Sequence, residues 1–124
     1  MNKIYKILIV EDNELNRDML SRRLERRGYQ ILVAEDGISG VEKTFKELPD
    51  LILMDINLPG IDGLEAVRRI RENSSTQMTP IIALSAHARI EDQKTSLEAG
   101  CNEYECKPVE INRLIQKINN LIKK

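Results

Sequence analysis

Three acidic residues stand directly after two short apolar segments of the chain. Glu11 and Asp12 follow an Ile-Leu-Ile-Val segment, and Asp55 follows a Leu-Ile-Leu-Met segment. If both segments are neighbouring buried parallel strands, their carboxyl ends meet at one edge of a sheet and bring the carboxylates together. Ser85 and Lys107 follow later strand-like segments. Three acids, one hydroxyl and one ammonium at one sheet edge would bind a divalent metal ion and a phosphoryl group.

Carboxylates held close together repel one another. Two unit charges about 4 Å apart interact by about 4 kcal/mol at an effective dielectric constant of about 20. Lys107 can offset one charge, and a hard divalent ion can offset the rest. Mg²⁺ fits best because it accepts carboxylates, keeps several waters and also binds phosphate oxygens. Taken alone, each acid is explained by a helix N-cap or a solvated loop, and for Asp12 alone that explanation is favoured; the three together favour a metal site.

Composition and charge restrict the class of protein. With 124 residues, of which 41% are hydrophobic, the chain suits one compact domain with its own core. A net charge of −1, with 31% charged residues of both signs, gives no electrostatic reason to expect nucleic acid or a membrane surface as partner. No run approaches the roughly 18 apolar residues of a membrane span, and the start does not fit a signal peptide. We therefore expect a soluble, cytoplasmic protein.

The two cysteines suggest no chemistry. Cys101 and Cys106, with a single histidine in the chain, make a poor zinc site. We interpret them as two reduced thiols.

Short apolar runs alternate with helical patterns, which is typical of βαβ units and a parallel sheet. This pattern predicts an α/β protein, a doubly wound (βα)5 sandwich with parallel strand order 2-1-3-4-5. Ligands of such sheets lie beyond the carboxyl ends of the strands, between strands 1 and 3. The predicted strands are 5–10, 30–34, 51–54, 81–84 and 103–106. The predicted helices are 14–27, one between Gly37 and Pro49, one after the loop of residues 57–62, 90–99, and one over the apolar positions from 111 to 122.

Apolar residues at helical spacing predict which helix faces contact the sheet. The fourth helix has the weakest such pattern and the last helix has the clearest. The predicted core positions are Leu15, Met19 and Leu24 in the first helix, Val41, Phe45 and Leu48 in the second, Leu64, Val67 and Ile70 in the third, and Ile111, Leu114, Ile115, Ile118, Leu121 and Ile122 in the last.

With these motifs the sequence resembles the receiver domains of two-component response regulators, over essentially its whole length. The resemblance implies a flavodoxin-like fold. Each motif is weak alone, but the set is specific in this order and at these strand ends. The motifs are Glu11-Asp12, Met54-Asp55, Leu58-Pro59-Gly60, Asp62-Gly63, Ser85-Ala86, and Gly100 through Tyr104 to Lys107-Pro108.

The resemblance implies the following chemistry. Asp55 is the phosphoacceptor and receives a phosphoryl group from a phosphohistidine on a sensor histidine kinase or a histidine phosphotransfer protein. Asp12, Asp55 and the main-chain carbonyl of Asn57 ligate Mg²⁺, and Glu11 acts mainly through water. Lys107 neutralises charge on the phosphoryl oxygens. The protein would be no enzyme in the usual sense, because it would catalyse only its own phosphorylation and dephosphorylation.

The resemblance also implies a conformational switch. Ser85 would hydrogen-bond a phosphoryl oxygen, and the small Ala86 would leave that group room. The peptide bond between Lys107 and Pro108 is cis in the family, which aims the ammonium into the site. Tyr104 matches the switch aromatic of the family; a partly buried edge-strand tyrosine is an equally good explanation for it. The switch would change the surface formed by residues 90–99, 103–106 and 111–122.

Two loop residues are expected to tune self-dephosphorylation. Asn57 and His87 would flank the approach of the hydrolytic water to the acyl phosphate; simple exposure to solvent explains His87 slightly better. The sequence departs from the commonest family pattern only at Glu11, where Asp is frequent, and at Ser85, where Thr is frequent. Neither departure puts phosphoacceptance in doubt.

Two other classes of protein share parts of this pattern. An aspartyl phosphatase of the haloacid dehalogenase type would have its Asp-x-Asp pattern after the first strand and a cap insertion, whereas Asp55-x-Asn57 follows the third strand here. A pure interaction module with this fold would usually lack one of the acids or the lysine.

Residues 1–124 are expected to form a single receiver domain with no output domain. The start at Met1 favours a stand-alone regulator over a segment of a hybrid kinase. Such a chain would act through a downstream target protein, as a monomer or a weak dimer.

Overall fold

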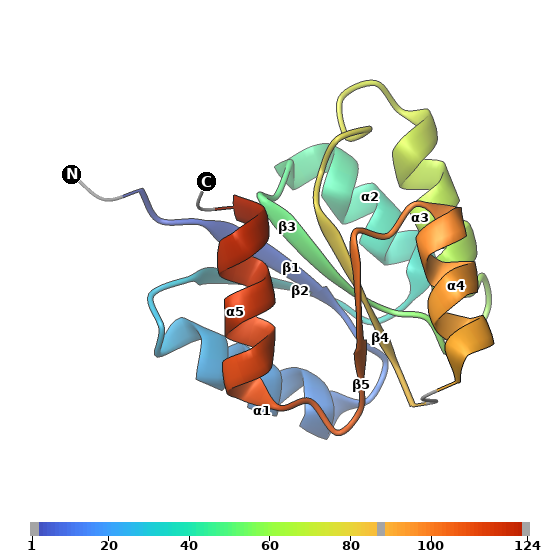
Figure 1. Cartoon of the computed structure of the whole chain (residues 1–124). Coiled ribbons are helices and arrows are strands. Elements are labelled where there is room, and N and C mark those ends of the chain that lie inside the picture. The colour runs from blue at the N-terminus through green and yellow to red at the C-terminus, as the bar shows by residue number, and fades with distance from the viewer. Residues whose placement is uncertain (1–2, 87–88, 123–124) are drawn as a thin grey trace.

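The computed structural model describes residues 3–86 and 89–122, over which five strands alternate with five helices (Figure 1). All strand pairs are parallel, and the strand order is β2-β1-β3-β4-β5. The predicted α/β doubly wound fold is thus confirmed. The strands are β1 Lys6–Val10, β2 Gln30–Ala34, β3 Leu51–Asp55, β4 Ile81–Ser85 and β5 Glu103–Cys106. The helices are α1 Glu14–Glu25, α2 Gly37–Glu47, α3 Gly63–Glu72, α4 Ile90–Ala99 and α5 Ile111–Ile122.

The predicted element boundaries agree with the structure to within two residues. β1 begins at Lys6, one residue later than predicted, and α1 ends at Glu25, two residues earlier. β3 and β4 each extend by one residue, so that Asp55 and Ser85 are the last residues of these strands. The two polar residues are therefore held by the main-chain hydrogen bonds of the sheet.

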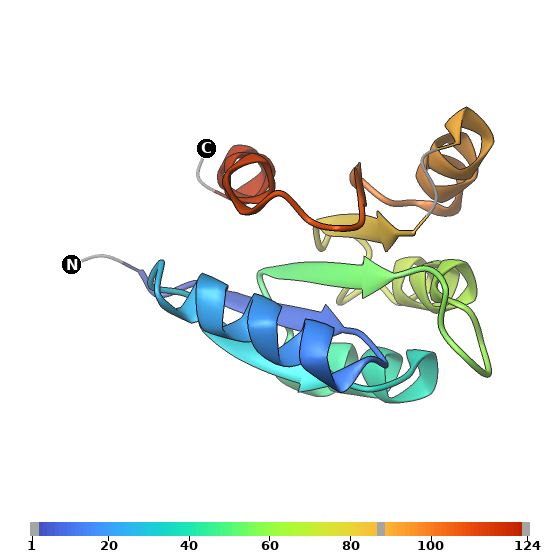
Figure 2. The same cartoon turned by 90° about the horizontal axis from the view of Figure 1, so that it is seen from below.

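The sheet is covered on both faces, which explains why β3 and β4 are almost entirely apolar. α1 and α5 lie on one face, and α2, α3 and α4 lie on the other (Figures 1 and 2). Alternate strand residues point to opposite faces and form two cores. The first core, under α1 and α5, includes Ile7, Ile9, Leu51, Leu53, Ile82 and Leu84. The second, under α2, α3 and α4, includes Leu8, Val10, Ile52, Met54, Ile81 and Ala83.

The predicted buried face of α1 is partly wrong. Leu24 is buried as expected, but Leu15 is 79% exposed and Met19 is 50% exposed. Leu20 takes their place and packs with Leu24 against the sheet. Positions 20 and 24 lie one turn apart, as do 15 and 19, so the spacing permits either pair to face the core. The rotation of α1 therefore leaves two apolar side chains on the surface.

The predicted buried face of α2 is also wrong at the C-terminal end of the helix. Val41 is buried, but Phe45 is 40% exposed and Leu48 is 54% exposed. Thr44 is fully buried instead, and its hydroxyl donates to the carbonyl of Gly40 at 2.8 Å, which satisfies the polar group. Leu48 has a φ of 48° and ends the helix, so its side chain leaves the helical face. The core positions Val67 and Ile70 of α3 and Leu114 and Ile118 of α5 are confirmed.

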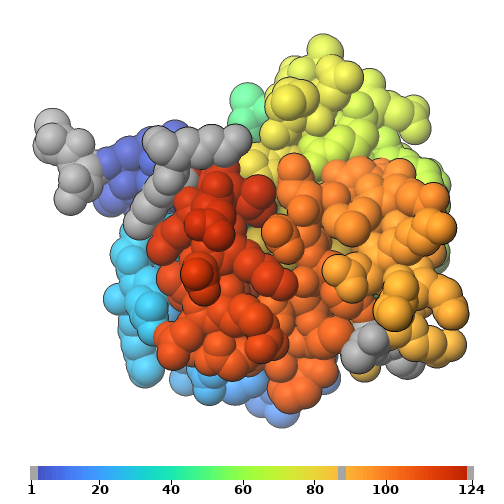
Figure 3. Space-filling view, in the orientation of Figure 1, coloured from blue at the N-terminus to red at the C-terminus, as the bar shows by residue number. Residues whose placement is uncertain are grey.

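α4 and α5 lie on one face of the molecule with β5 between them (Figure 3). α4, which has the weakest apolar pattern in the sequence, leaves Ile90 and Leu97 82% and 43% exposed. We refer to α4, β5 and α5 below as the α4–β5–α5 surface.

Candidate functional site

The end of β1 supplies the first two acids. Glu11 is only 2% exposed, and its main-chain N–H donates to the carbonyl of Ala34 in β2 at 3.0 Å. Its Oε2 accepts a hydrogen bond from the main-chain N–H of Asn13 at 3.1 Å. Asn13, not Asp12, is the N-cap of α1, because its Oδ1 accepts from Asn16 N at 3.0 Å. The N-cap explanation for Asp12 is therefore wrong, and its exposed carboxylate is available to a ligand.

The end of β3 supplies the third acid. Asp55 is 2% exposed, and its Oδ1 accepts a hydrogen bond from the main-chain N–H of Asn57 at 2.8 Å. α3 begins very close behind it: a Cβ added to Gly63 would contact the Asp55 carbonyl oxygen and lie 2.5 Å from the Ile56 Cα. Asp62 caps this helix by accepting from Glu65 N at 2.8 Å. Only glycine fits between the start of α3 and the end of β3.

Lys107, just beyond β5, joins the two buried acids. Its Nζ lies 2.7 Å from Glu11 Oε1 and 2.9 Å from Asp55 Oδ2. Burial disfavours the ammonium, but the hydrogen bonds to Glu11 and Asp55 outweigh this and raise the pKa of Lys107. The Lys107–Pro108 peptide bond is cis. Lys107 is therefore a permanent cation between the ends of β1 and β3.

The three acids form one cluster. Ligand oxygens of Glu11, Asp12 and Asp55 lie within 4.8 Å of one another. Burial and, to a smaller extent, repulsion from Asp55 raise the pKa of Glu11, against the opposing effect of Lys107. Three carboxylates and one ammonium leave two negative charges in the cluster. Oxygen donors with this excess charge fit a hard divalent cation such as Mg²⁺.

The end of β4 lies beside the acidic cluster and contributes Ser85 and Ala86. Ser85 is fully buried, and its carbonyl accepts from Lys107 N at 2.7 Å, so β4 and β5 are tied together beside the acids. Ala86 is exposed, and its N–H donates to Asn57 Oδ1 at 3.3 Å. Tyr104 is 8% exposed; burial raises its pKa, and a hydrogen bond with the Ser85 side chain opposes that shift. The tyrosine thus points inward and contacts the residue expected to bind phosphate.

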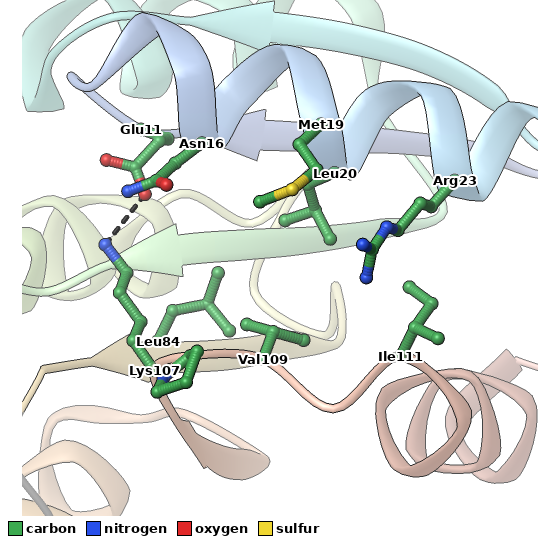
Figure 4. A pocket seen from close by; sticks show the side chains of 10 residues that line it. Glu11, Asn16, Met19, Leu20, Arg23, Leu84, Lys107, Val109 and Ile111 are labelled. Atoms are coloured by element: carbon green, nitrogen blue, oxygen red, sulfur yellow. Dashed lines mark hydrogen bonds and ion pairs between the residues drawn. The ribbon is translucent and has the colours of Figure 1, made fainter.

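A hollow of about 220 Å³ lies next to the acids, between α1 and the segment after β5 (Figure 4). Glu11 and Lys107 stand at one end of it, and Arg23 projects toward Ile111 at the other. Its middle is lined by the apolar side chains of Met19, Leu20, Leu84 and Val109. This hollow cannot be predicted from the sequence pattern, because it depends on the rotation of α1. The lining residues are Glu11, Asn16, Met19, Leu20, Arg23, Leu84, Lys107, Pro108, Val109 and Ile111.

Most of the predicted site residues come together at the carboxyl edge of the sheet. Glu11, Asp12, Asp55 and Lys107 form the charged cluster, and Asn57 contacts both Asp55 and the segment after β4. Ser85, Ala86 and Tyr104 border it, as described above. His87 lies outside the described residues. Cys101 is buried and Cys106 is half-buried, and neither of these two cysteines is part of a disulfide.

Arg17 is a residue of this site that the sequence pattern does not identify. Its guanidinium donates to the main-chain carbonyl of Glu11 at 3.0 Å. Arginines are frequent in α1, and no feature of the sequence distinguishes this one from Arg22 or Arg23.

Comparison with known proteins agrees with this geometry. Residues 7–119 match the family model of the response regulator receiver domain. The chain is 34% identical over 116 residues to the polar-differentiation response regulator DivK of Brucella anthropi, and the match covers 94% of each chain.

Two solved structures have the same architecture. The receiver domain of the sensor histidine kinase PA1611 from Pseudomonas aeruginosa has a TM-score of 0.91 and 36% identity, covers 98% of this chain and 100% of its own, and holds a magnesium ion in its active site cleft. The chemotaxis protein CheY4 of Vibrio cholerae has a TM-score of 0.90 and 28% identity, with 96% and 99% of the two chains covered.

A doubly wound sheet with acids at the ends of β1 and β3 and a lysine after β5 is typical of a class of signalling domain rather than of a classical enzyme. This chain belongs to the response regulator receiver domain family of two-component systems. None of the helices within residues 3–86 and 89–122 is long and apolar enough to cross a lipid bilayer.

Proposed function

We propose that this protein is a phosphoacceptor whose Asp55 receives a phosphoryl group from a phosphohistidine. The donor would be a sensor histidine kinase or a histidine phosphotransfer protein. The contact of Lys107 with both Glu11 and Asp55, beside Asp12, carries this proposal. In the reaction, an Asp55 carboxylate oxygen forms a bond to phosphorus while the bond from phosphorus to the histidine nitrogen breaks. The ammonium lies next to the attacking carboxylate, where it would offset the negative charge of the incoming phosphoryl oxygens.

Glu11, Asp12 and Asp55 would hold Mg²⁺, together with the main-chain carbonyl of Asn57. When bound, the ion offsets negative charge on the transferring phosphoryl group. Glu11 and Asp55 are already desolvated and need no rearrangement to bury their charge. The exposed Asp12 leaves the site open to solvent, from which an ion and a donor can enter.

Ser85, Ala86 and Tyr104 would sense the phosphoryl group. The Ser85 hydroxyl would donate to a phosphoryl oxygen, and the small side chain of Ala86 leaves space for it. Ser85 would then exchange its hydrogen bond with Tyr104, which couples β4 to β5, for one with the phosphoryl group. Tyr104 would lose this partner. We infer that phosphorylation shifts the population of Tyr104 conformations and thereby alters the α4–β5–α5 surface.

The α4–β5–α5 surface would then bind a downstream target protein. Its exposed Ile90 and Leu97 supply apolar contact area for such a partner. The phosphoryl donor would bind at a different place, the hollow between α1 and the segment after β5. This hollow opens directly beside Glu11 and Lys107 (Figure 4). Donor and target would therefore use different faces.

Asn57 and His87 would tune the lifetime of the acyl phosphate by admitting or excluding the hydrolytic water. Asn57 is exposed, and its side-chain oxygen accepts from Ala86 N, so it stands between the Asp55 loop and the segment after β4. The protein would catalyse only its own phosphorylation and dephosphorylation.

The proposed transfer is tested with phosphoimidazole, which carries the same phosphorus–nitrogen bond as phosphohistidine. Intact-mass spectrometry of the wild type should find one added phosphoryl group in Mg²⁺ and none in excess EDTA. The Asp55→Asn variant should stay unmodified in both. Equal uptake by wild type and Asp55→Asn would show that the transfer uses another residue. Equal uptake by the wild type in Mg²⁺ and in EDTA would contradict the proposed role of the metal ion.

A further inference from the structure

Among the described residues, no hydrogen bond or ion pair holds the Asp12 carboxylate in place. Its oxygen nevertheless lies within 4.8 Å of ligand oxygens on Glu11 and Asp55. Glu11 and Asp55, by contrast, are each fixed by Lys107 and by a main-chain N–H. The direction of the Asp12 side chain must therefore be set by the main chain that carries it.

That main chain is held by an arginine. We infer that Arg17 is a positioning residue for the metal site, an inference that rests on the function proposed above. Arg17 Nη1 donates to the Glu11 carbonyl oxygen at 3.0 Å. This carbonyl belongs to the planar peptide unit that ends at the Asp12 Cα. Because the Glu11 N–H is also fixed, by the Ala34 carbonyl in β2, the hydrogen bond from Arg17 sets the direction in which the chain enters Asp12.

The guanidinium itself is well anchored. Arg17 lies in α1, where its N–H donates to the Asn13 carbonyl at 2.9 Å, and its side chain is only 12% exposed. Its Nη2 is 3.6 Å from Glu35 Oε1, just beyond β2. Because the guanidinium is rigid and planar and has several donors, it can contact the Glu11 carbonyl and the Glu35 carboxylate at the same time. Arg17 thus connects the loop of the metal site to α1 and to the segment after β2.

Two effects of Arg17 on metal affinity have opposite signs. As a cation near the cluster, it repels a metal ion, so its removal would tighten binding if charge alone mattered. As the support of the Glu11–Asp12 peptide, it orders a ligand before the ion arrives, so its removal would weaken binding. The direct contact and the partial compensation by Glu35 make positioning the larger effect. The sign of the change therefore separates the two explanations.

The test is the affinity for Mn²⁺, measured by electron paramagnetic resonance of the free ion, in wild type, Arg17→Ala and Arg17→Lys. We expect Arg17→Ala to bind about tenfold more weakly, the usual lower limit for loss of a group that orients a metal ligand. Arg17→Lys, which keeps one donor and the charge, should recover part of the loss. Glu35→Gln should change affinity by less than about twofold, because Glu35 is 76% exposed.

Two controls separate positioning from general effects. Arg68→Ala removes the same charge from an exposed site in α3 and should leave the affinity unchanged. Ile118→Val lowers stability from the buried core of α5 and should also leave it unchanged, which excludes loss of stability as the cause. In the metal-free protein, Arg17→Ala should also speed amide hydrogen exchange over residues 11–13.

Equal or tighter Mn²⁺ binding by Arg17→Ala would overturn this inference and leave the phosphoacceptor proposal intact. Absence of Mn²⁺ binding by the wild type would instead contradict the proposed metal site itself.

Discussion

Lys107 Nζ lies 2.9 Å from Asp55 Oδ2, although the two residues are 52 positions apart in the chain. The same ammonium is 2.7 Å from Glu11 Oε1, so one cation joins the ends of β1, β3 and β5. Among the described residues, this ammonium is the direct counter-charge for both buried carboxylates.

Replacing Lys107 should make the protein less stable and more dependent on metal. Lys107→Ala leaves Glu11 and Asp55 without their charged donor, which should cost about 1–3 kcal/mol of unfolding free energy in EDTA. The variant should bind Mg²⁺ more tightly because three acids then face the ion uncompensated. Thermal unfolding with and without Mg²⁺ checks this: Mg²⁺ should raise the Tm of Lys107→Ala more than that of the wild type. An equal increase would contradict the predicted competition.

Glu11 should oppose folding at neutral pH when no metal is bound. Burial raises its pKa in the folded protein, so the folded state favours its protonated form. The associated stabilisation is present below the ordinary pKa of 4.5 and is lost as the pH rises through the raised value. Glu11→Gln mimics the neutral form and should raise the Tm in EDTA at pH 7, with the gain disappearing toward pH 4. The exposed Glu14→Gln is the control; a Tm gain of Glu11→Gln that is independent of pH would refute the assignment.

Gly63→Ala should damage the site through the main chain of Asp55. The added Cβ would collide with the main chain at the C-terminal end of β3, so α3 must move. This should lower the free energy of unfolding by about 1–3 kcal/mol. Gly28→Ala is a suitable control because Gly28 has a φ of 93° but no atom within 4 Å of an added Cβ. Both variants should lose stability in urea unfolding, but only Gly63→Ala should slow phosphorylation by phosphoimidazole. Equal rates in the two variants would contradict the close packing of α3 on the site.

Glu105 is a buried acid that serves structure rather than phosphoryl chemistry. It is 2% exposed, accepts from Arg113 Nε at 2.8 Å and lies 2.9 Å from Lys117 Nζ, which connects β5 to α5. Burial would raise its pKa, but these two cations lower it. Its stabilisation is therefore present above the ordinary pKa of 4.5 and is lost as the pH falls through the lowered value.

Glu105→Gln should therefore cost about 2 kcal/mol at pH 7, less than a fully buried pair because Arg113 is 53% exposed. The difference from wild type should shrink as the pH falls below 4.5. Urea unfolding at several pH values measures it, with the exposed Glu72→Gln as control. A difference that does not vary with pH would show that the carboxylate charge is not what stabilises the α5 contact.

The sequence predicts the sheet and the acids well because both depend on local, additive signals. Apolar runs such as 51–54 permit only a doubly covered strand, and the residue after each run must lie at the sheet edge. The orientation of α1 is different, since Leu15 with Met19 and Leu20 with Leu24 have the same spacing. The packing of the whole sheet selects between them, and the hollow beside Lys107 and the contact from Arg17 to Glu11 follow from that choice.

The central claim is that Asp55 is the residue that takes the phosphoryl group. Its most direct test is peptide mapping by tandem mass spectrometry after incubation of the wild type with acetyl phosphate and Mg²⁺. We predict a single modified peptide with the phosphoryl group on Asp55, labile to hydroxylamine as an acyl phosphate must be. Modification of a different residue, or none in Mg²⁺ at saturating acetyl phosphate, would contradict the account.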